Sequence, residues 1–166
     1  LAGIIGVRIE RSINKIKIIP QVTRPGVVIG RGGSGLEELK KELCKKVSLP
    51  DPEKNLEVSP EEVKNPELSA YFVAQKISEQ IEKRMPYRQA IKKSLERTMT
   101  AGAKGIKVAL SGRINGAEIA RREKFVVGKI PLQTIRAKID YADVPALTRS
   151  GYVGVKVWIY QGDKTI

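Results

Sequence analysis

The sequence has no histidine and a single cysteine, Cys44, among its 166 residues. These two scarcities exclude a disulfide within the chain, argue against a zinc site, and remove the usual general base of an enzyme. Cys44 lies inside a helical pattern, where a small half-buried thiol is the ordinary explanation, and no basic partner for a nucleophile is identifiable. We therefore expect a protein without catalytic residues, metal or cofactor.

Long apolar runs are also absent, since no segment approaches the roughly 18 residues that a membrane helix requires. The first residues show no signal segment, so we expect a soluble intracellular protein without a membrane partner. Leu1 is not an initiator methionine, and we expect further residues before it in the native protein. With 41% hydrophobic and 30% charged residues, the chain should fold around one good core or two small ones.

Acidic residues are few compared with basic ones: the sequence has 18 Asp and Glu and 31 Lys and Arg, which gives a net charge of +13. Such a surplus predicts a polyanionic partner, although charge alone does not separate RNA from DNA or anionic lipid. Residues 1–84 carry 15 basic against 12 acidic residues, net +3, whereas residues 85–166 carry 16 against 6, net +10. We expect the second half to supply most of the electrostatic affinity.

A glycine-rich loop at residues 30–35 leads into an amphipathic helix that carries Leu36, Leu39 and Leu43 on one face. Such a junction suits phosphate, because backbone N–H groups and the positive end of the helix dipole point the same way. Gly30, Arg31, Gly32 and Gly33 also satisfy the GxxG loop of a KH domain, which holds the backbone of single-stranded nucleotides.

Two other interpretations of this loop stay open at this point. Gly30, Gly32 and Gly35 satisfy the dinucleotide fingerprint G-x-G-x-x-G. The candidate ribose-binding acids are Asp51, Glu53 and Glu57. That match is weak, because Pro25 and Gly26 leave only residues 27–29 as a leading strand. The loop could also be a plain glycine turn that only caps the helix.

The remaining patterns predict alternating strands and helices. Residues 7–11 and 15–19 alternate as an antiparallel hairpin, residues 49–55 form a loop, and a third strand runs from residue 56 towards 63. A helix follows, capped either by Asn65 with Pro66 after it or by Ser69, which is favoured. Met85 and Pro86 separate it from a second helix over residues 87–101. Residues 106–110, 136–141 and 154–160 predict strands of one mostly antiparallel sheet, with a turn or short helix at 117–120.

The second helix carries two i,i+4 pairs of cations, Arg88 with Lys92 and Lys93 with Arg97. Like charges so placed repel each other slightly, so a partner is expected to offset them. The alternative is an ordinary solvated basic surface.

Several blocks of the chain, in order, resemble protein three of the small ribosomal subunit in its bacterial form. These blocks are residues 24–33, 65–70, 102–108, 111–113 with 116–121, 130–132 with 136–141, and 151–158. The match covers nearly the whole chain and is far more specific than either glycine motif.

The resemblance implies an α+β protein, with a type II KH domain of three strands, helices and a GxxG loop over residues 1–85. A two-layer α/β domain with a mostly antiparallel sheet follows over residues 86–166. Members of the family have a further amino-terminal segment that the domain expected at residues 1–85 lacks. They lie in the head of the small subunit and help to unwind messenger RNA where it enters, without nucleotide hydrolysis.

The family's messenger RNA positions match Arg88 and Lys92, but its intervening arginine falls on Gln89. Asn115, Arg122 and Gln133 also depart from the family pattern, which suggests a divergent lineage or an organelle version. The expected partners are small-subunit ribosomal RNA, messenger RNA and neighbouring head proteins, on a cytoplasmic or organelle ribosome. The expected ribosomal RNA contacts are Lys93, Arg97, Lys104, Lys107, Arg113, Arg121, Arg122, Lys129 and Arg136.

Two alternative functions compete with this expectation. A free-standing KH regulator of messenger RNA is the closer one, but eight aromatic residues are few for reading bases mainly by stacking. A dinucleotide-dependent enzyme is the weaker alternative, because its fingerprint lacks a proper leading strand.

Overall fold

The computed structural model describes residues 3–13, 15–46 and 55–163, which form two compact units, Leu1–Lys64 and Asn65–Ile166. The sequence placed the boundary near Met85 and Pro86, where one helix ends and the next begins. The units divide earlier because the preceding helix buries its apolar face in the second core. The charge is as uneven between these units, since residues 1–64 carry 12 basic against 9 acidic residues, net +3, and residues 65–166 carry 19 against 9, net +10.

The first unit begins with the predicted hairpin, formed by β1 (Ile4–Arg11) and β2 (Ile16–Val22) in antiparallel pairing. The Ser12 N–H donates a 2.8 Å hydrogen bond to the Lys15 carbonyl and closes the turn. β2 ends two residues before Arg24, as expected ahead of Pro25, which removes a donor from the ladder. The predicted antiparallel hairpin is therefore confirmed.

The third strand of this sheet is split into β3 (Leu56–Val58) and β4 (Glu61–Glu62), both parallel to β2. The two segments keep one register, because Ile18 pairs with Val58 and Gln21 pairs with Glu61. Pro60 lies between them and offers no N–H to the ladder. The expected loop at residues 49–55 lies largely outside the described residues.

Residues 27–29, expected as a short strand, belong instead to the helix α1 (Pro25–Ile29). Proline suits the first helical position, so Pro25 starts a helix here. A 3-10 turn, η1 (Arg31–Gly33), links α1 to α2 (Ser34–Lys46). The predicted helix is confirmed, with Leu36, Leu39, Leu43 and Cys44 half-buried.

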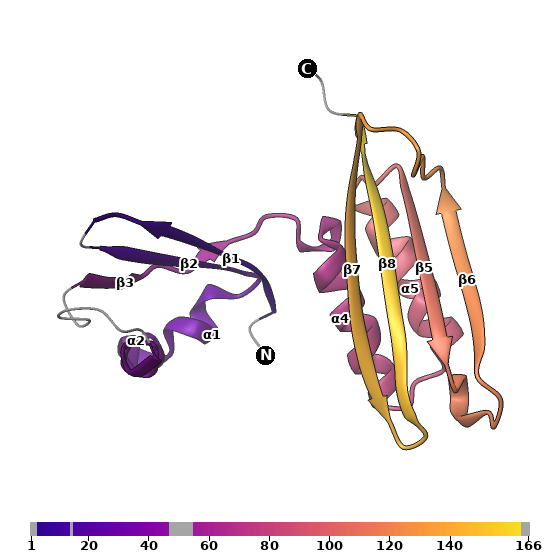
Figure 1. Ribbon diagram of the computed structural model, residues 1–166, viewed down its shortest axis with the longest axis horizontal. Helices are drawn as coiled ribbons and strands as arrows, with labels where there is room; N and C mark the ends of the chain where they lie inside the picture. Colours follow the sequence, from indigo (N-terminus) through magenta and orange to yellow (C-terminus); the bar gives the residue numbers. More distant parts are fainter. Residues whose placement is uncertain (1–2, 14, 47–54, 164–166) are drawn as a thin grey trace. The chain divides into compact units, whose positions relative to one another are not determined.

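The second unit is a four-stranded antiparallel sheet in the order β6-β5-β8-β7. Its strands are β5 (Gly105–Gly112), β6 (Arg121–Gly128), β7 (Ala137–Thr148) and β8 (Gly151–Asp163). Figure 1 shows α4 (Ala70–Glu82) and α5 (Tyr87–Thr100) together on one face of this sheet. The expected two-layer arrangement and the α+β fold class are confirmed.

The core of the second unit lies between the helices and the sheet. Val73 and Ile77 of α4 and Ile91 of α5 are fully buried in one core with Val155 and Val157 of β8. The period of 3.6 in the helices and of 2 in the strands brings these apolar faces together. A short turn, η2 (Pro66–Leu68), precedes α4, and Ser69 occupies the predicted N-cap position but makes no side-chain capping bond.

The sequence patterns missed part of the second sheet. Residues 121–128 form the edge strand β6, which the charged run at 121–124 concealed, because Glu123 and Phe125 alone among its eight residues are half-buried. β7 continues past the expected end at residue 141 and tolerates Pro145 because it is the other edge. The short helical turn expected at 117–120 lies earlier, as η3 (Ile114–Gly116).

Candidate nucleic-acid interface

The glycine loop of the first unit is built by two kinds of glycine. Gly30 and Gly35 serve packing, since a Cβ on Gly30 would lie 2.9 Å from the Gly35 nitrogen and a Cβ on Gly35 would lie 2.8 Å from the Val28 carbonyl oxygen. Contacts this short exclude any side chain at either position. These two glycines therefore let α1 and α2 approach each other across the loop.

Gly32 and Gly33 lie on the outer side of the loop and leave its backbone open. Their φ angles of +64° and +86° favour glycine, yet a Cβ on either would meet no atom within 4 Å. Arg31 beside them is exposed, and the Ser34 hydroxyl donates a 3.1 Å hydrogen bond to the Arg31 carbonyl. The loop thus presents open backbone and one cation at the start of a 13-residue helix, an arrangement that suits a phosphate.

This geometry contradicts the dinucleotide alternative. A dinucleotide fingerprint must follow a buried strand, but the residues leading into this loop form α1, none of which is buried. Of the candidate ribose-binding acids, Glu57 lies in β3, and Asp51 and Glu53 fall outside the described residues.

The exposed face of α5 carries the two predicted cation pairs. Arg88, Lys92, Lys93 and Arg97 are all exposed, and at 100° per residue the first pair and the second pair lie on opposite flanks of this face. Ile91 and Leu95, with 0% and 7% of their surface exposed, fix the helix against the sheet beneath them. The cations are therefore mounted on a rigid support.

Arg88 belongs to a small network that the sequence did not reveal. Its Nε donates a 3.1 Å hydrogen bond to the Tyr87 hydroxyl, which donates a 3.0 Å bond to Oε1 of Glu123 on β6. The Tyr87 hydroxyl first, and then the Glu123 carboxylate, raise the pKa of Arg88 above its ordinary value. Arg121 also lies 3.7 Å from Glu123, so this flank gathers two arginines around one carboxylate.

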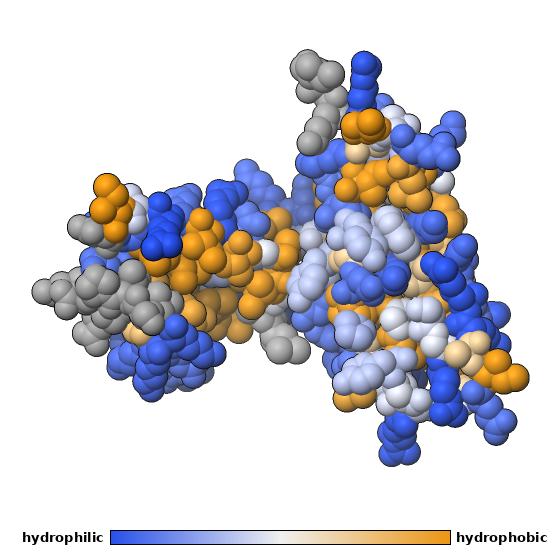
Figure 2. Space-filling model, viewed as in Figure 1, coloured by the Kyte–Doolittle hydropathy of each residue, from blue (hydrophilic) through white to orange (hydrophobic). Residues whose placement is uncertain are grey.

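The sheet face opposite the helices forms a second basic surface. Lys107 Nζ lies 4.9 Å from the centre of the Trp158 ring, and the Tyr141 and Trp158 ring centroids are 5.2 Å apart. Arg122 and Lys124 extend this face across β6, opposite Ser111 and Ala109. Figure 2 shows hydrophilic residues on the β6 side and residues of intermediate hydropathy over β7 and β8.

The other predicted contacts are scattered. Lys104 precedes the eight-residue strand β5 and Arg113 follows it, so they lie about 30 Å apart along the strand. Arg113 donates to the carbonyls of Ala117 and Ser150 at 2.9 and 3.5 Å, and exposed Lys129 and Arg136 flank the segment between β6 and β7. The predicted residues therefore cover several faces of the second unit.

In residues 3–13, 15–46 and 55–163, no three His, Cys, Asp or Glu side chains are grouped to hold a metal ion. In the same part of the chain, no helix combines the length and the hydropathy needed to cross a membrane.

Known proteins resemble this chain along nearly its whole length. A family model described as "KH domain" matches residues 1–68, and one described as "Ribosomal protein S3, C-terminal domain" matches residues 77–159. Small ribosomal subunit protein uS3 is 52% identical over 163 residues in Dictyoglomus turgidum, 48% over 162 in Clostridium novyi and 49% over 162 in Desulforamulus reducens. Each match covers 98% of this chain, but 64%, 72% and 71% of these relatives, so the chain spans less than two thirds of the first.

Proposed function

The chain belongs to the family of small ribosomal subunit protein uS3, and we propose that it is a structural, RNA-binding constituent of that subunit rather than an enzyme. The observation that carries this proposal is identity of about one half sustained over 98% of the chain. Its location would be the ribosome, in the subunit head beside the neighbouring head proteins.

The second unit is proposed as the main anchor on ribosomal RNA. It carries the net charge of +10, whereas the first unit carries +3. Folded RNA offers phosphates in several directions, which suits cations spread over several faces. The proposed anchoring residues are Lys93, Arg97, Lys104, Lys107, Arg113, Arg121, Arg122, Lys129 and Arg136.

Arg88 and Lys92 are proposed to hold messenger RNA as it enters the subunit. They lie one turn apart on an exposed flank of α5, so both charges can reach the same stretch of phosphate backbone. Holding the open strand after a base pair breaks is passive unwinding driven by translocation, and it needs no nucleotide site. The glycine loop at Gly30, Arg31, Gly32 and Gly33 is proposed as a further contact with RNA backbone.

Co-sedimentation tests the ribosomal proposal. Tagged chain is expressed in a bacterial host, and the ribosomal subunits are separated on sucrose gradients after a high-salt wash. We expect the chain to remain with the small subunit at about one copy per particle, because many phosphate contacts and protein neighbours hold it. Release of the chain by the wash, together with its recovery on messenger RNA, would favour the free-standing KH regulator instead.

A further inference from the structure

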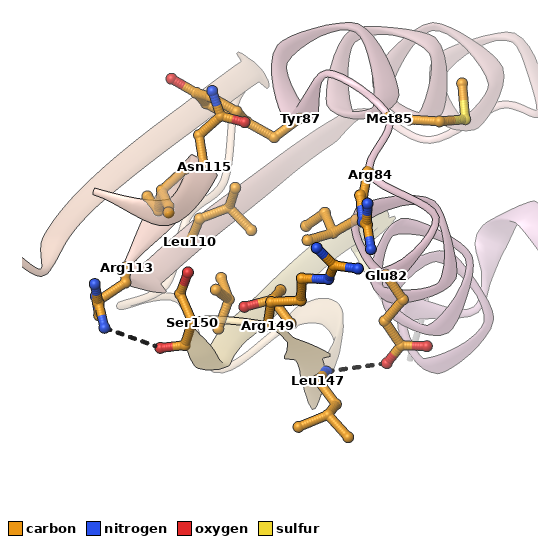
Figure 3. Close-up of a pocket in the computed structure, with 15 residues that line it drawn as sticks. Glu82, Arg84, Met85, Tyr87, Leu110, Arg113, Asn115, Leu147, Arg149 and Ser150 are labelled. Carbon is orange, nitrogen blue, oxygen red and sulfur yellow. Dashed lines mark hydrogen bonds between the residues drawn. The ribbon is translucent and has the colours of Figure 1, made fainter. Parts of the chain in front are cut away.

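A pocket of about 360 Å³ lies at one end of the second unit, where three turns meet. These turns are the α4–α5 connection, η3, and the β7–β8 hairpin (Figure 3). Leu110, Ile114 and Val153, each at most 2% exposed, are among its lining residues and supply an apolar floor. The size and the apolar floor are typical of a site for a small molecule or for one unit of a polymer.

Three arginines and one carboxylate are the charged residues that line the pocket: Arg84, Arg113, Arg149 and Glu82. Glu82 accepts a 3.0 Å hydrogen bond from the Leu147 N–H, and Arg113 donates to the carbonyls of Ala117 and Ser150. Figure 3 shows the Arg84 and Arg149 side chains pointing towards one another. Neither forms a salt bridge with another described residue, so two guanidinium groups are available to an anion.

Arg84 occupies a backbone position that favours glycine. At the end of α4, the Arg84 N–H bonds the Ile81 carbonyl at 2.9 Å and the Met85 N–H bonds the Gln80 carbonyl at 3.0 Å, the pattern of a Schellman motif. Arg84 adopts a φ of 59° at the left-handed position of this motif. An arginine there is strained relative to glycine, which adopts this conformation freely.

α5 ends in the same motif but with the expected residue. There the Gly102 N–H bonds the Met99 carbonyl at 3.1 Å, the Ala103 N–H bonds the Thr98 carbonyl at 3.3 Å, and Gly102 has a φ of 100°. Asn115, at 60°, is the other non-glycine residue with a positive φ among the described residues, and it also lines the pocket. Backbone strain of this kind often marks a functional site.

We propose that this pocket binds one nucleoside 5′-phosphate unit. The base would lie on the apolar floor beside the Tyr87 ring, whose hydroxyl is already engaged with Glu123. The phosphate would lie between Arg84 and Arg149, because guanidinium groups bind phosphate through paired charge-assisted hydrogen bonds. An unstacked nucleotide of single-stranded RNA has this chemistry, and RNA as its source rests on the proposed function.

Titration of the full chain with uridine or adenosine 5′-monophosphate, followed by ¹H–¹⁵N NMR, tests the proposal. We expect saturable shifts at the signals of the pocket residues, with the matching nucleoside and inorganic phosphate each binding at least roughly tenfold more weakly. Arg149→Gln should weaken mononucleotide binding roughly tenfold, by loss of one charge-assisted contact. Lys138→Gln removes the same charge from an exposed site outside the pocket and should leave binding within about twofold.

Inorganic phosphate binding as tightly as the mononucleotide, or an unchanged affinity in Arg149→Gln, would overturn the proposal. Competition by a short single-stranded RNA would support RNA as the source, whereas its failure to compete would overturn RNA and leave the free nucleotide. Co-sedimentation separates the two proposals. An Arg149→Gln chain that loses the nucleotide but stays on the small subunit supports both, while a wild-type chain that stays on the subunit and binds no mononucleotide overturns the pocket alone.

Discussion

The backbone N–H of Ala70 donates a 2.7 Å hydrogen bond to Oδ2 of Asp140, so a carboxylate from β7 caps the first turn of α4. Ser69 at the N-cap position does not make this bond. The cap therefore joins residues 70 positions apart in the sequence and ties the helix to the sheet. A negative charge at a helix N-terminus also interacts favourably with the helix dipole.

Asp140→Ala should lower the free energy of unfolding by about 1 kcal/mol, since it removes this cap and its charge. Urea denaturation followed by circular dichroism measures the change. Asp143→Ala is the matched control, because its 3.4 Å pair with Lys156 joins side chains that are 46% and 39% exposed. An exposed pair should contribute only about 0.5 kcal/mol or less. Equal losses in the two variants would show that Asp140 does not cap α4.

The exposed glycines of the loop give a second prediction. Gly32→Asp with Gly33→Asp should weaken RNA binding roughly tenfold, because two negative charges about 6 Å from a phosphate each oppose binding by about 0.7 kcal/mol in water. Both positions have positive φ, so any side chain adds strain. Gly32→Asn with Gly33→Asn has nearly the same shape and strain without the charge. Equal RNA affinities for the Asp and Asn pairs in fluorescence anisotropy would show that this loop does not bind a phosphate.

The flank of α5 that carries Arg88 and Lys92 gives a third prediction. Arg88→Ala with Lys92→Ala should slow translation through a hairpin by a few fold, because exposed contacts of this kind contribute about 0.3 to 0.5 kcal/mol each. Unstructured messages should be unaffected, and Gln89→Arg should partly restore the rate. A reconstituted translation assay on matched messages measures this. Lys93→Ala with Arg97→Ala, on the opposite flank, should not produce this hairpin-specific effect, and equal slowing on both messages would assign Arg88 and Lys92 to ribosomal RNA anchoring.

The two helix ends predict opposite effects on stability. Arg84→Gly should raise the free energy of unfolding by roughly 0.5 to 1 kcal/mol, because glycine adopts the left-handed conformation without strain. Gly102→Ala should lower it by about 1 kcal/mol through strain alone, since an added Cβ meets no atom within 4 Å. Thermal unfolding measures both. A loss of stability in Arg84→Gly would mean that the arginine side chain supports the fold.

The local patterns predicted the elements whose apolar residues recur with a regular period in the sequence. The hairpin of β1 and β2 and the helices α2, α4 and α5 each carry one apolar face, so their period was readable. α1 was mistaken for a strand because Val27, Val28 and Ile29 are β-branched, and its packing against α2 through Gly35 overrides that propensity. β6 was missed because two of its eight residues, Glu123 and Phe125, are half-buried, and the first of them is charged, so no apolar period is readable.

The candidate sites also differ in how far the sequence could predict them. The glycine loop and the α5 cations are local in sequence, so their spacing alone marked them as candidates. The Arg84 and Arg149 pocket joins turns from three parts of the chain, and only the fold brings them together. One local signal was available: Arg84 stands at the end of a predicted helix, where the left-handed position favours glycine.

One crosslinking measurement tests the central claim that α5 faces messenger RNA. A photoreactive amino acid replaces Gln89, which is exposed between Arg88 and Lys92, or Thr100 at the far end of the same exposed face as control. Salt-washed small subunits carrying each variant are loaded with labelled messenger RNA and irradiated. We expect crosslinks from position 89 to messenger RNA nucleotides that have not yet reached the decoding site, and none from position 100. Crosslinks from position 89 to ribosomal RNA alone would contradict the claim that α5 faces messenger RNA.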